Sequence, residues 1–230
     1  MGNNGPVNEL ITPPTLRPVR GTARCAVAAL ALAAVAWTAR ALWQIRLAAS
    51  GMPASGPPDQ GDGRHRPLNA LENGYHLVNA LGAVAAVLCA ITFLAWLWRV
   101  RDNAHALSGQ PPRHAWPWVY AGWLVPVANL WIPRAIVVDI HRASAPGERL
   151  PRAVNWWWGL WLVGLLGEVG LGATDKVIAR AYQHVLPLLV GDAAALGAAL
   201  TGILVVRALT AAQQRPRPTA PPQQAATPPR

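Results

Sequence analysis

The chain has 230 residues, of which 53% are hydrophobic and 13% are charged, and its formal net charge is +10. The apolar residues form long uninterrupted blocks, which is typical of a membrane protein and unlike a water-soluble domain. The positive residues are mostly arginines beside those blocks, an arrangement that orients a membrane protein. Because the arginines do not gather on one helix face, we expect the lipid bilayer as the chain's surroundings and no nucleic-acid partner.

The N-terminal part predicts a tail, a first membrane span and a loop. Residues 1–20 contain Asn, Gly and Pro without periodicity, which indicates a disordered tail. Residues 25–44 are rich in Ala and Leu and predict a transmembrane helix. The polar "GTAR" before Cys25 does not fit a cleaved signal, so we expect this block to remain as an anchor. Residues 49–73 are rich in Gly, Pro and Asp and predict an extracytoplasmic loop.

The second span is predicted at residues 75–98. It ends in "WLWRVR", in which indole rings and then guanidinium groups suit the headgroup layer. We therefore expect this end of the span to face the cytoplasm.

A segment interrupted by prolines follows at residues 116–143 and contains "VPVANLWIPR". Its apolar part, residues 119–133, would reach about 22 Å as a helix, which is short of the roughly 30 Å hydrocarbon core. Pro126 and Pro133 each remove a backbone donor and favour a break in the helix. A re-entrant or interfacial helix is expected, and a fifth crossing is the alternative.

Two more spans are predicted, at residues 155–173 and 184–207, and a disordered Pro/Gln-rich tail at residues 211–230. The tails enclose a membrane domain at residues 21–210. The fold expected is an all-α integral membrane protein, a bundle of four transmembrane helices plus one proline-broken re-entrant or interfacial helix.

The arginines favour four crossings over five. If the proline segment crossed the membrane, Arg142, Arg149 and Arg152 would lie opposite to Arg99 and Arg101. If the segment dips in and returns, both of these basic loops and the arginines near both termini fall on one side. We therefore expect a multi-pass protein of the bacterial cytoplasmic membrane with both termini in the cytoplasm.

Three stretches also resemble a known family: "FLAWLWRVRDNAHAL", "WVYAGWLVPVANLWIPRAIVVDIHRAS" and "NWWWGLWL". Together they look like the bacterial membrane family catalogued as domain of unknown function 4328, over roughly residues 75–205. The resemblance implies a multi-pass membrane domain with no established activity, and no catalytic role comes with its motif. The positions that match the motif are Arg99, Asn103, Trp123, Pro126, Asn129, Leu130, Pro133 and Ser144.

Three charges fall inside predicted spans, namely Arg40, Glu168 and Asp192. At about 1.5 Å per residue, all three lie in the outer half of the bilayer. A lone charge near mid-membrane costs roughly 3 kcal/mol on insertion scales, so a polar cluster is expected in which Arg40 pairs with Asp192 and Glu168 lies nearby. In the alternative, Arg40 reaches the outer headgroups and the carboxyl groups are neutral.

Other polar and aromatic features have ordinary explanations beside functional ones. Asn129 could ligate an ion at a broken helix, but a helix cap is the commoner role. Residues 156–158 are three tryptophans that predict an interfacial anchor. The histidines give no short chelating pair, so no metal site is expected. Ala194, Ala198 and Gly202 recur every fourth residue and favour packing against other spans over a homodimer face.

No catalytic or nucleotide-binding motif is present, so neither an enzyme nor a cofactor is expected. The function predicted is an interaction or accessory protein of the membrane, with a membrane-protein partner or a homo-oligomer. The alternative is a small transporter or channel subunit that uses the broken helix and the buried charges. An intramembrane enzyme that uses the carboxyl groups is a further alternative.

Overall fold

The computed structural model describes residues 16–59, 63, 66–109, 117–125, 127–171 and 177–215. Within these ranges the protein is all-helical and has no strand, which confirms the all-α class. The elements in chain order are α1 (Arg20–Ser50), α2 (Ala70–Ser108), α3 (Trp118–Leu124), the 3-10 helix η1 (Ala128–Leu130), α4 (Ile132–Ser144), α5 (Arg152–Leu171), α6 (Val177–Gln183) and α7 (Val185–Gln214).

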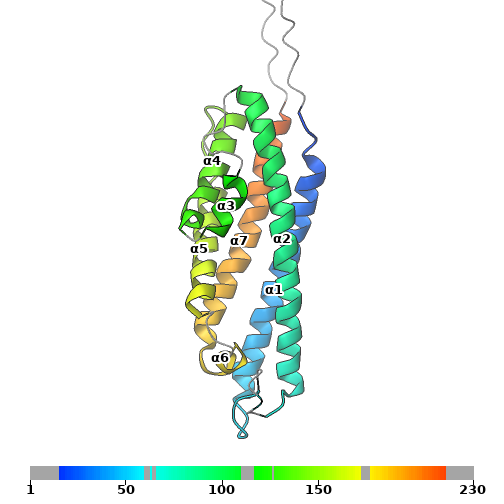
Figure 1. Ribbon diagram of the computed structural model, residues 1–230, viewed down its shortest axis with the longest axis vertical. Helices are drawn as coiled ribbons and strands as arrows, with labels where there is room; N and C mark the ends of the chain where they lie inside the picture. Colours follow the sequence, from blue (N-terminus) through cyan, green and yellow to red (C-terminus); the bar gives the residue numbers. More distant parts are fainter. Residues whose placement is uncertain are drawn as a thin grey trace, which may run out of the picture.

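The four long helices α1, α2, α5 and α7 lie along the long axis of the bundle (Figure 1). α1 packs against α2 and α7, and α7 packs against α5. The start of α1 and the end of α7 meet at one end, where Arg20 Nε donates a hydrogen bond of 3.2 Å to Gln214 Oε1. We call this the terminal end. The opposite, distal end carries α6 and the loop between α1 and α2 (Figure 1).

Among the described residues, α1, α2 and α7 are long and apolar enough to cross a membrane. α1 has 31 residues, α2 has 39 and α7 has 30, so each is longer than the roughly 20 residues that a crossing needs. Their exposed surface is rich in large apolar side chains, such as Leu81 and Val84 of α2. These three helices indicate a membrane protein.

The helices extend beyond the predicted spans, and two boundaries differ from the sequence analysis. Residues 211–214, which we expected in the tail, form the last turn of α7, where Gln213 is buried. Residues 16–20 are described too, and Val19 is buried. Both segments are ordered by contacts with the bundle. The local composition does not predict these contacts. α6 was not predicted because its seven residues are too few to form a stable helix alone.

The proline segment forms α3, η1 and α4 in succession. Pro133 occupies the first turn of α4, where a missing backbone donor costs nothing, so it starts this helix and does not kink it. Pro126 lies outside the described residues. A Cβ on Gly122 of α3 would lie 2.7 Å from Ile132 Cγ2, so only glycine allows α3 and α4 to approach this closely.

Small residues set the contact between α5 and α7. A Cβ on Gly164 would lie 3.5 Å from the backbone nitrogen of Ala195, and one on Gly167 would lie 3.6 Å from the Cα of Gly191. The stripe of Ala194, Ala198 and Gly202 is buried inside the chain. The expectation that this stripe packs internally is therefore confirmed.

Candidate functional site

The contact between α1 and α7 brings two of the predicted intramembrane charges together. Arg40 Nε donates a hydrogen bond of 2.8 Å to Asp192 Oδ1, and Nη2 of the same guanidinium donates to the same oxygen. The side chain of Asp192 is 1% exposed and that of Arg40 is 16% exposed. The guanidinium carbon of Arg40 also lies 4.1 Å from the centre of the Trp37 ring. The pair therefore balances its own charge in surroundings with little water.

The third predicted charge, Glu168, belongs to α5, and its side chain lies outside the described part of the chain. Its neighbour Gly167 faces Gly191, which precedes Asp192. The structure thus brings Arg40 and Asp192 together.

Two of the family-motif positions meet in a buried polar network at the terminal end. Asn103 Oδ1 accepts a hydrogen bond of 2.9 Å from the backbone N–H of Arg17, and Asn103 Nδ2 donates one of 2.9 Å to the Arg17 carbonyl. Gln213 Oε1 accepts from Asn103 Nδ2 at 3.4 Å. Gln213 Nε2 donates to the Val100 carbonyl at 2.7 Å and to Ser144 Oγ at 3.1 Å. This terminal-end network joins the N-terminal segment to α2, α4 and α7.

Two further motif positions also make structural contacts. Arg99 Nη1 donates a hydrogen bond of 3.2 Å to the Pro18 carbonyl. Trp123 of α3 packs edge-on against Phe93 of α2 and Trp161 of α5, with ring centroids 5.8 and 5.5 Å apart. These motif residues therefore position α3 and the N-terminal segment on the bundle.

Of the motif positions in the break between α3 and α4, Asn129 does not act as a cap. α4 begins without a side-chain cap hydrogen bond, which corrects the capping role expected for Asn129. Asn129 is buried, and its Oδ1 accepts no hydrogen bond from the described residues. Pro133 is also buried, whereas Leu130 is exposed.

The tryptophan cluster is mostly interior. Trp156 is 65% exposed, whereas Trp157 is 3% and Trp158 is 7% exposed. Trp157 packs against Phe93 with ring centroids 5.8 Å apart, and Trp158 stacks on Trp161 at 5.1 Å. The prediction of an interfacial anchor thus fits Trp156 alone, because the helix turns the next two rings into the core.

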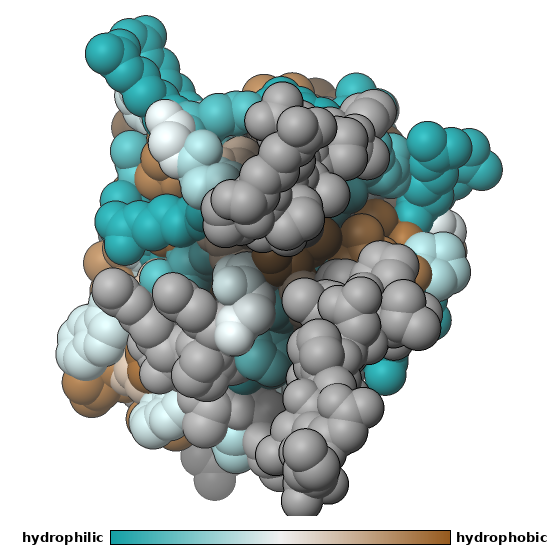
Figure 2. All heavy atoms as spheres, turned by 90° about the horizontal axis from the view of Figure 1, so that it is seen from above, coloured by the Kyte–Doolittle hydropathy of each residue, from teal (hydrophilic) through white to brown (hydrophobic). Residues whose placement is uncertain are grey.

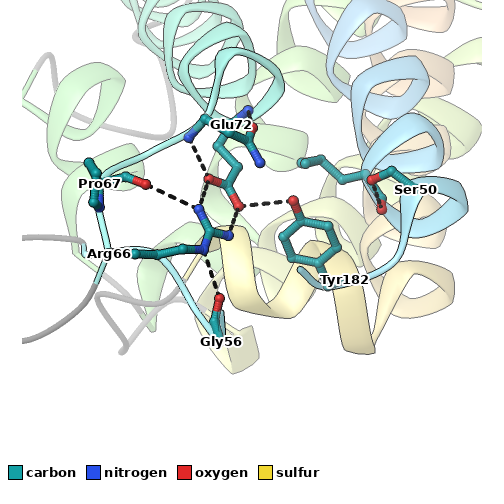
Figure 3. Close-up of polar contacts among 8 residues, drawn as sticks. Ser50, Gly56, Arg66, Pro67, Glu72 and Tyr182 are labelled. Atoms are coloured by element: carbon teal, nitrogen blue, oxygen red, sulfur yellow. Dashed lines mark hydrogen bonds and ion pairs between the residues drawn. The ribbon is translucent and has the colours of Figure 1, made fainter. Parts of the chain in front are cut away.

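A second polar cluster, at the distal end, surrounds the fully buried Glu72 (Figure 3). Arg66 donates hydrogen bonds of 2.8 and 2.6 Å to the two carboxylate oxygens, and Tyr182 Oη donates one of 2.9 Å. The backbone N–H of Asn69 donates to Glu72 Oε2 at 2.9 Å, and Asn69 Oδ1 accepts from the Glu72 N–H. The hydrogen bond from Arg66 lowers the pKa of Glu72 more than burial raises it. The cluster fastens the loop and α6 to the start of α2.

Sequence reasoning missed both the Glu72 cluster and Gln213. The stretch "NALE", residues 69–72, has the asparagine and glutamate of a capping box and could have marked the start of α2. Nothing local distinguishes Gln213 from the exposed Gln214. Within the described part of the chain, no three His, Cys, Asp or Glu side chains gather in a way that could hold a metal ion.

Comparison with known proteins confirms the family resemblance. A family model described as a domain of unknown function (DUF4328) matches residues 68–211. This range runs from the loop before α2 to the last turn of α7, so it contains Asp192 and the motif positions but not Arg40. No curated protein and no solved structure matches the chain.

Proposed function

We propose that this chain, which belongs to the DUF4328 family, crosses the bacterial cytoplasmic membrane four times and acts there as an accessory protein that binds a partner membrane protein. Both termini are cytoplasmic in this proposal. α1, α2, α5 and α7 make the four crossings, and α3 and α4 form a re-entrant hairpin from the cytoplasmic side.

The path of α3 and α4 along α2 supports a re-entrant hairpin. Tyr120 stacks on Trp98, and Trp123 packs against Phe93, which lies five residues further from the terminal end. The chain then returns, because Ser144 at the end of α4 accepts a hydrogen bond from Gln213 in the terminal-end network. A segment that enters and leaves the membrane on the same side leaves the following residues on that side.

The length and packing of α5 support its role as the fourth crossing. It has 20 residues, about 30 Å of helix, which equals the thickness of the hydrocarbon core. It packs against α7, and its exposed residues Val163 and Leu166 are apolar.

The distribution of arginines supports cytoplasmic termini. Figure 2, which views the terminal end from above, shows hydrophilic residues along the upper part and both sides of this end, with apolar residues between them. The described arginines in the ten helix residues nearest to this end and in its connections are Arg17, Arg20, Arg24, Arg99, Arg101, Arg142, Arg149, Arg152, Arg207 and Arg215. An excess of arginine beside membrane spans marks the cytoplasmic side.

The buried residues of α7 favour an accessory role over transport. Asp192 and Thr210 are 18 residues, or about 27 Å, apart along this helix. Every residue of α7 that is buried between them is apolar, namely Ala194, Ala198, Ala199, Gly202, Val205, Val206 and Leu209. A polar solute that passed through the bundle along α7 would therefore meet no fully buried polar side chain of this helix between Asp192 and Thr210. Transport is the alternative, which the buried Arg40–Asp192 pair favours.

A periplasmic reporter fused in the loop after Ser55 and, separately, after Ala145 tests the topology. Activity at the first position and none at the second is expected. Activity after Ala145 would mean that the proline segment crosses the membrane, and the four-crossing proposal would fail.

Reconstitution tests the role. The purified chain in liposomes should release neither trapped ions nor trapped polar solutes, and in its native membrane it should crosslink to one stable protein partner. Flux that the parent shows and Asp192→Asn abolishes would replace the accessory role with transport.

A further inference from the structure

An apolar cavity of about 560 Å³ opens between α2 and α5, with α1 and α7 as its floor. This volume falls within the roughly 300–1,000 Å³ of small-molecule sites. Ala195, Ala198 and Ala199 of α7 and Ala33 of α1 form much of the floor. Their short side chains leave the space that leucines would fill.

Aromatic rings from three helices close the cavity on its terminal side. Phe93 of α2 lies 5.8 Å from Trp157 of α5 and 5.8 Å from Trp123 of α3, measured between ring centroids. On the distal side the lining includes Trp37, whose ring centre lies 4.1 Å from the guanidinium carbon of Arg40. Because Arg40 forms an ion pair with Asp192, its positive charge near the cavity is already neutralised.

In the four-crossing topology proposed above, on which this inference rests, the cavity lies at the middle of the membrane and borders its lipid-facing surface. On α2 it extends from Ala86 to Leu94, within the apolar residues 75–98. Val87 and Ile91, next to the lining residues Ala86 and Ala90, are 59% and 60% exposed. A hydrocarbon chain in the bilayer can therefore enter sideways without crossing a polar layer.

The size of the cavity distinguishes a hydrocarbon chain from a partner helix. Along α7 the lining runs from Gly191 to Ala199, about 12 Å. A partner helix that crosses the membrane extends over about 30 Å, more than twice the length of this lining. A single lipid tail is narrower and has the apolar chemistry of the lining.

We infer that this cavity binds one hydrocarbon tail of a membrane phospholipid. The small residues of α1 and α7 accommodate the chain, and the rings of Phe93, Trp123 and Trp157 stop it on the terminal side. The bound tail fills the space between α2 and α5.

Native mass spectrometry of the full chain, extracted in a mild detergent and washed to remove surface lipid, tests the inference. The parent should retain one phospholipid per chain. Ala90→Phe places a ring in the cavity, so this variant should not retain the phospholipid. If Ala90→Phe does not fold, Ala86→Phe takes its place in the test. Ala83→Phe is the matched control, because Ala83 is exposed on α2 and does not line the cavity, so it should retain the phospholipid.

A second measurement uses the tryptophans of the lining. Vesicles of phosphatidylcholine with brominated tails should quench the fluorescence of the parent more than that of Ala90→Phe, and Ala83→Phe should behave as the parent does. The inference would be overturned if the parent retained no lipid. It would also be overturned if Ala90→Phe and Ala83→Phe retained equal amounts of lipid. A photo-crosslink in cells from position 90 to a second protein that position 83 does not form would overturn it too, because it would assign the cavity to a partner helix.

Discussion

Arg40 of α1 and Asp192 of α7 lie 152 positions apart in the sequence and share two hydrogen bonds between one guanidinium and one carboxylate oxygen. The bonds fix the relative height of the two helices, because a shift of one turn would separate the charges by about 5 Å. The pair therefore couples the first apolar helix of the chain to the last.

Breaking this pair should destabilise the protein more than removing it. Asp192→Asn leaves the guanidinium of Arg40 buried without its carboxylate, and we expect a loss of about 3 kcal/mol in the free energy of unfolding. Arg40→Gln should cost a similar amount. The double variant should recover part of the loss, since neither charge then remains. Thermal melting in detergent of the parent, both single variants and the double variant measures the coupling.

Arg46→Gln is the control for the loss of an arginine. Arg46 is exposed and lies 5.3 Å from the ring of Trp43, so its removal deletes a cation–π contact without breaking an intramembrane pair. It should change the melting temperature little. Strictly additive losses in the double variant would contradict a coupled pair.

The terminal-end network should depend on Gln213 and not on its neighbour. Gln213→Ala removes the hydrogen bonds to the Val100 carbonyl and to Ser144, and it deprives Asn103 of an acceptor. Since these groups are buried, we expect a loss of about 1–3 kcal/mol in the free energy of unfolding. Gln214→Ala alters an exposed side chain and should be almost neutral. Equal melting temperatures for the two variants would show that the network does not stabilise the bundle.

The sequence predicted the all-helical membrane class because long apolar blocks have few other structures open to them in a bilayer. It also placed Arg40 and Asp192 at a similar depth, because helical rise is constant and both charges are counted from the ends of apolar blocks. Their contact in the structure agrees with that estimate.

Residues whose order depends on distant partners could not be predicted in this way. Gln213 occurs in a polar stretch, and its partners lie on α2 and α4. α6 is too short to form alone and is held where Ile178 and Ala181 pack against Leu47 and Tyr75. Local composition carries no information about such contacts.

The close contact of Gly202 with two helices gives a packing prediction. A Cβ at this position would lie 3.3 Å from Trp157 Cδ1 and 3.4 Å from Leu30 Cδ2, so the larger side chain of valine has no room. Gly202→Val should lower the free energy of unfolding by about 1–3 kcal/mol. Gly159→Val is the control, because a Cβ there meets nothing within 4 Å. If Gly202→Val kept the parent's melting temperature but turned a dimer into a monomer, the stripe would face a second copy.

The Glu72 cluster predicts how stability responds to acid. Glu72 precedes the apolar residues of α2, and the hydrogen bond from Arg66 is the largest of the effects that lower its pKa in the folded protein. A group of this kind adds stability that is fully present above its unfolded pKa, about 4.3, and is lost as the pH falls through the lower folded pKa. The parent should therefore exceed Glu72→Gln in melting temperature at neutral pH, and the difference should shrink below about pH 4. Glu148→Gln, which removes an ion pair to Arg215 between two exposed side chains, should have little effect at neutral pH. Thermal melting in detergent, measured from neutral pH downward, checks this prediction. If the difference in melting temperature between the parent and Glu72→Gln stays constant with pH, the cluster does not hold the carboxylate in its ionised form.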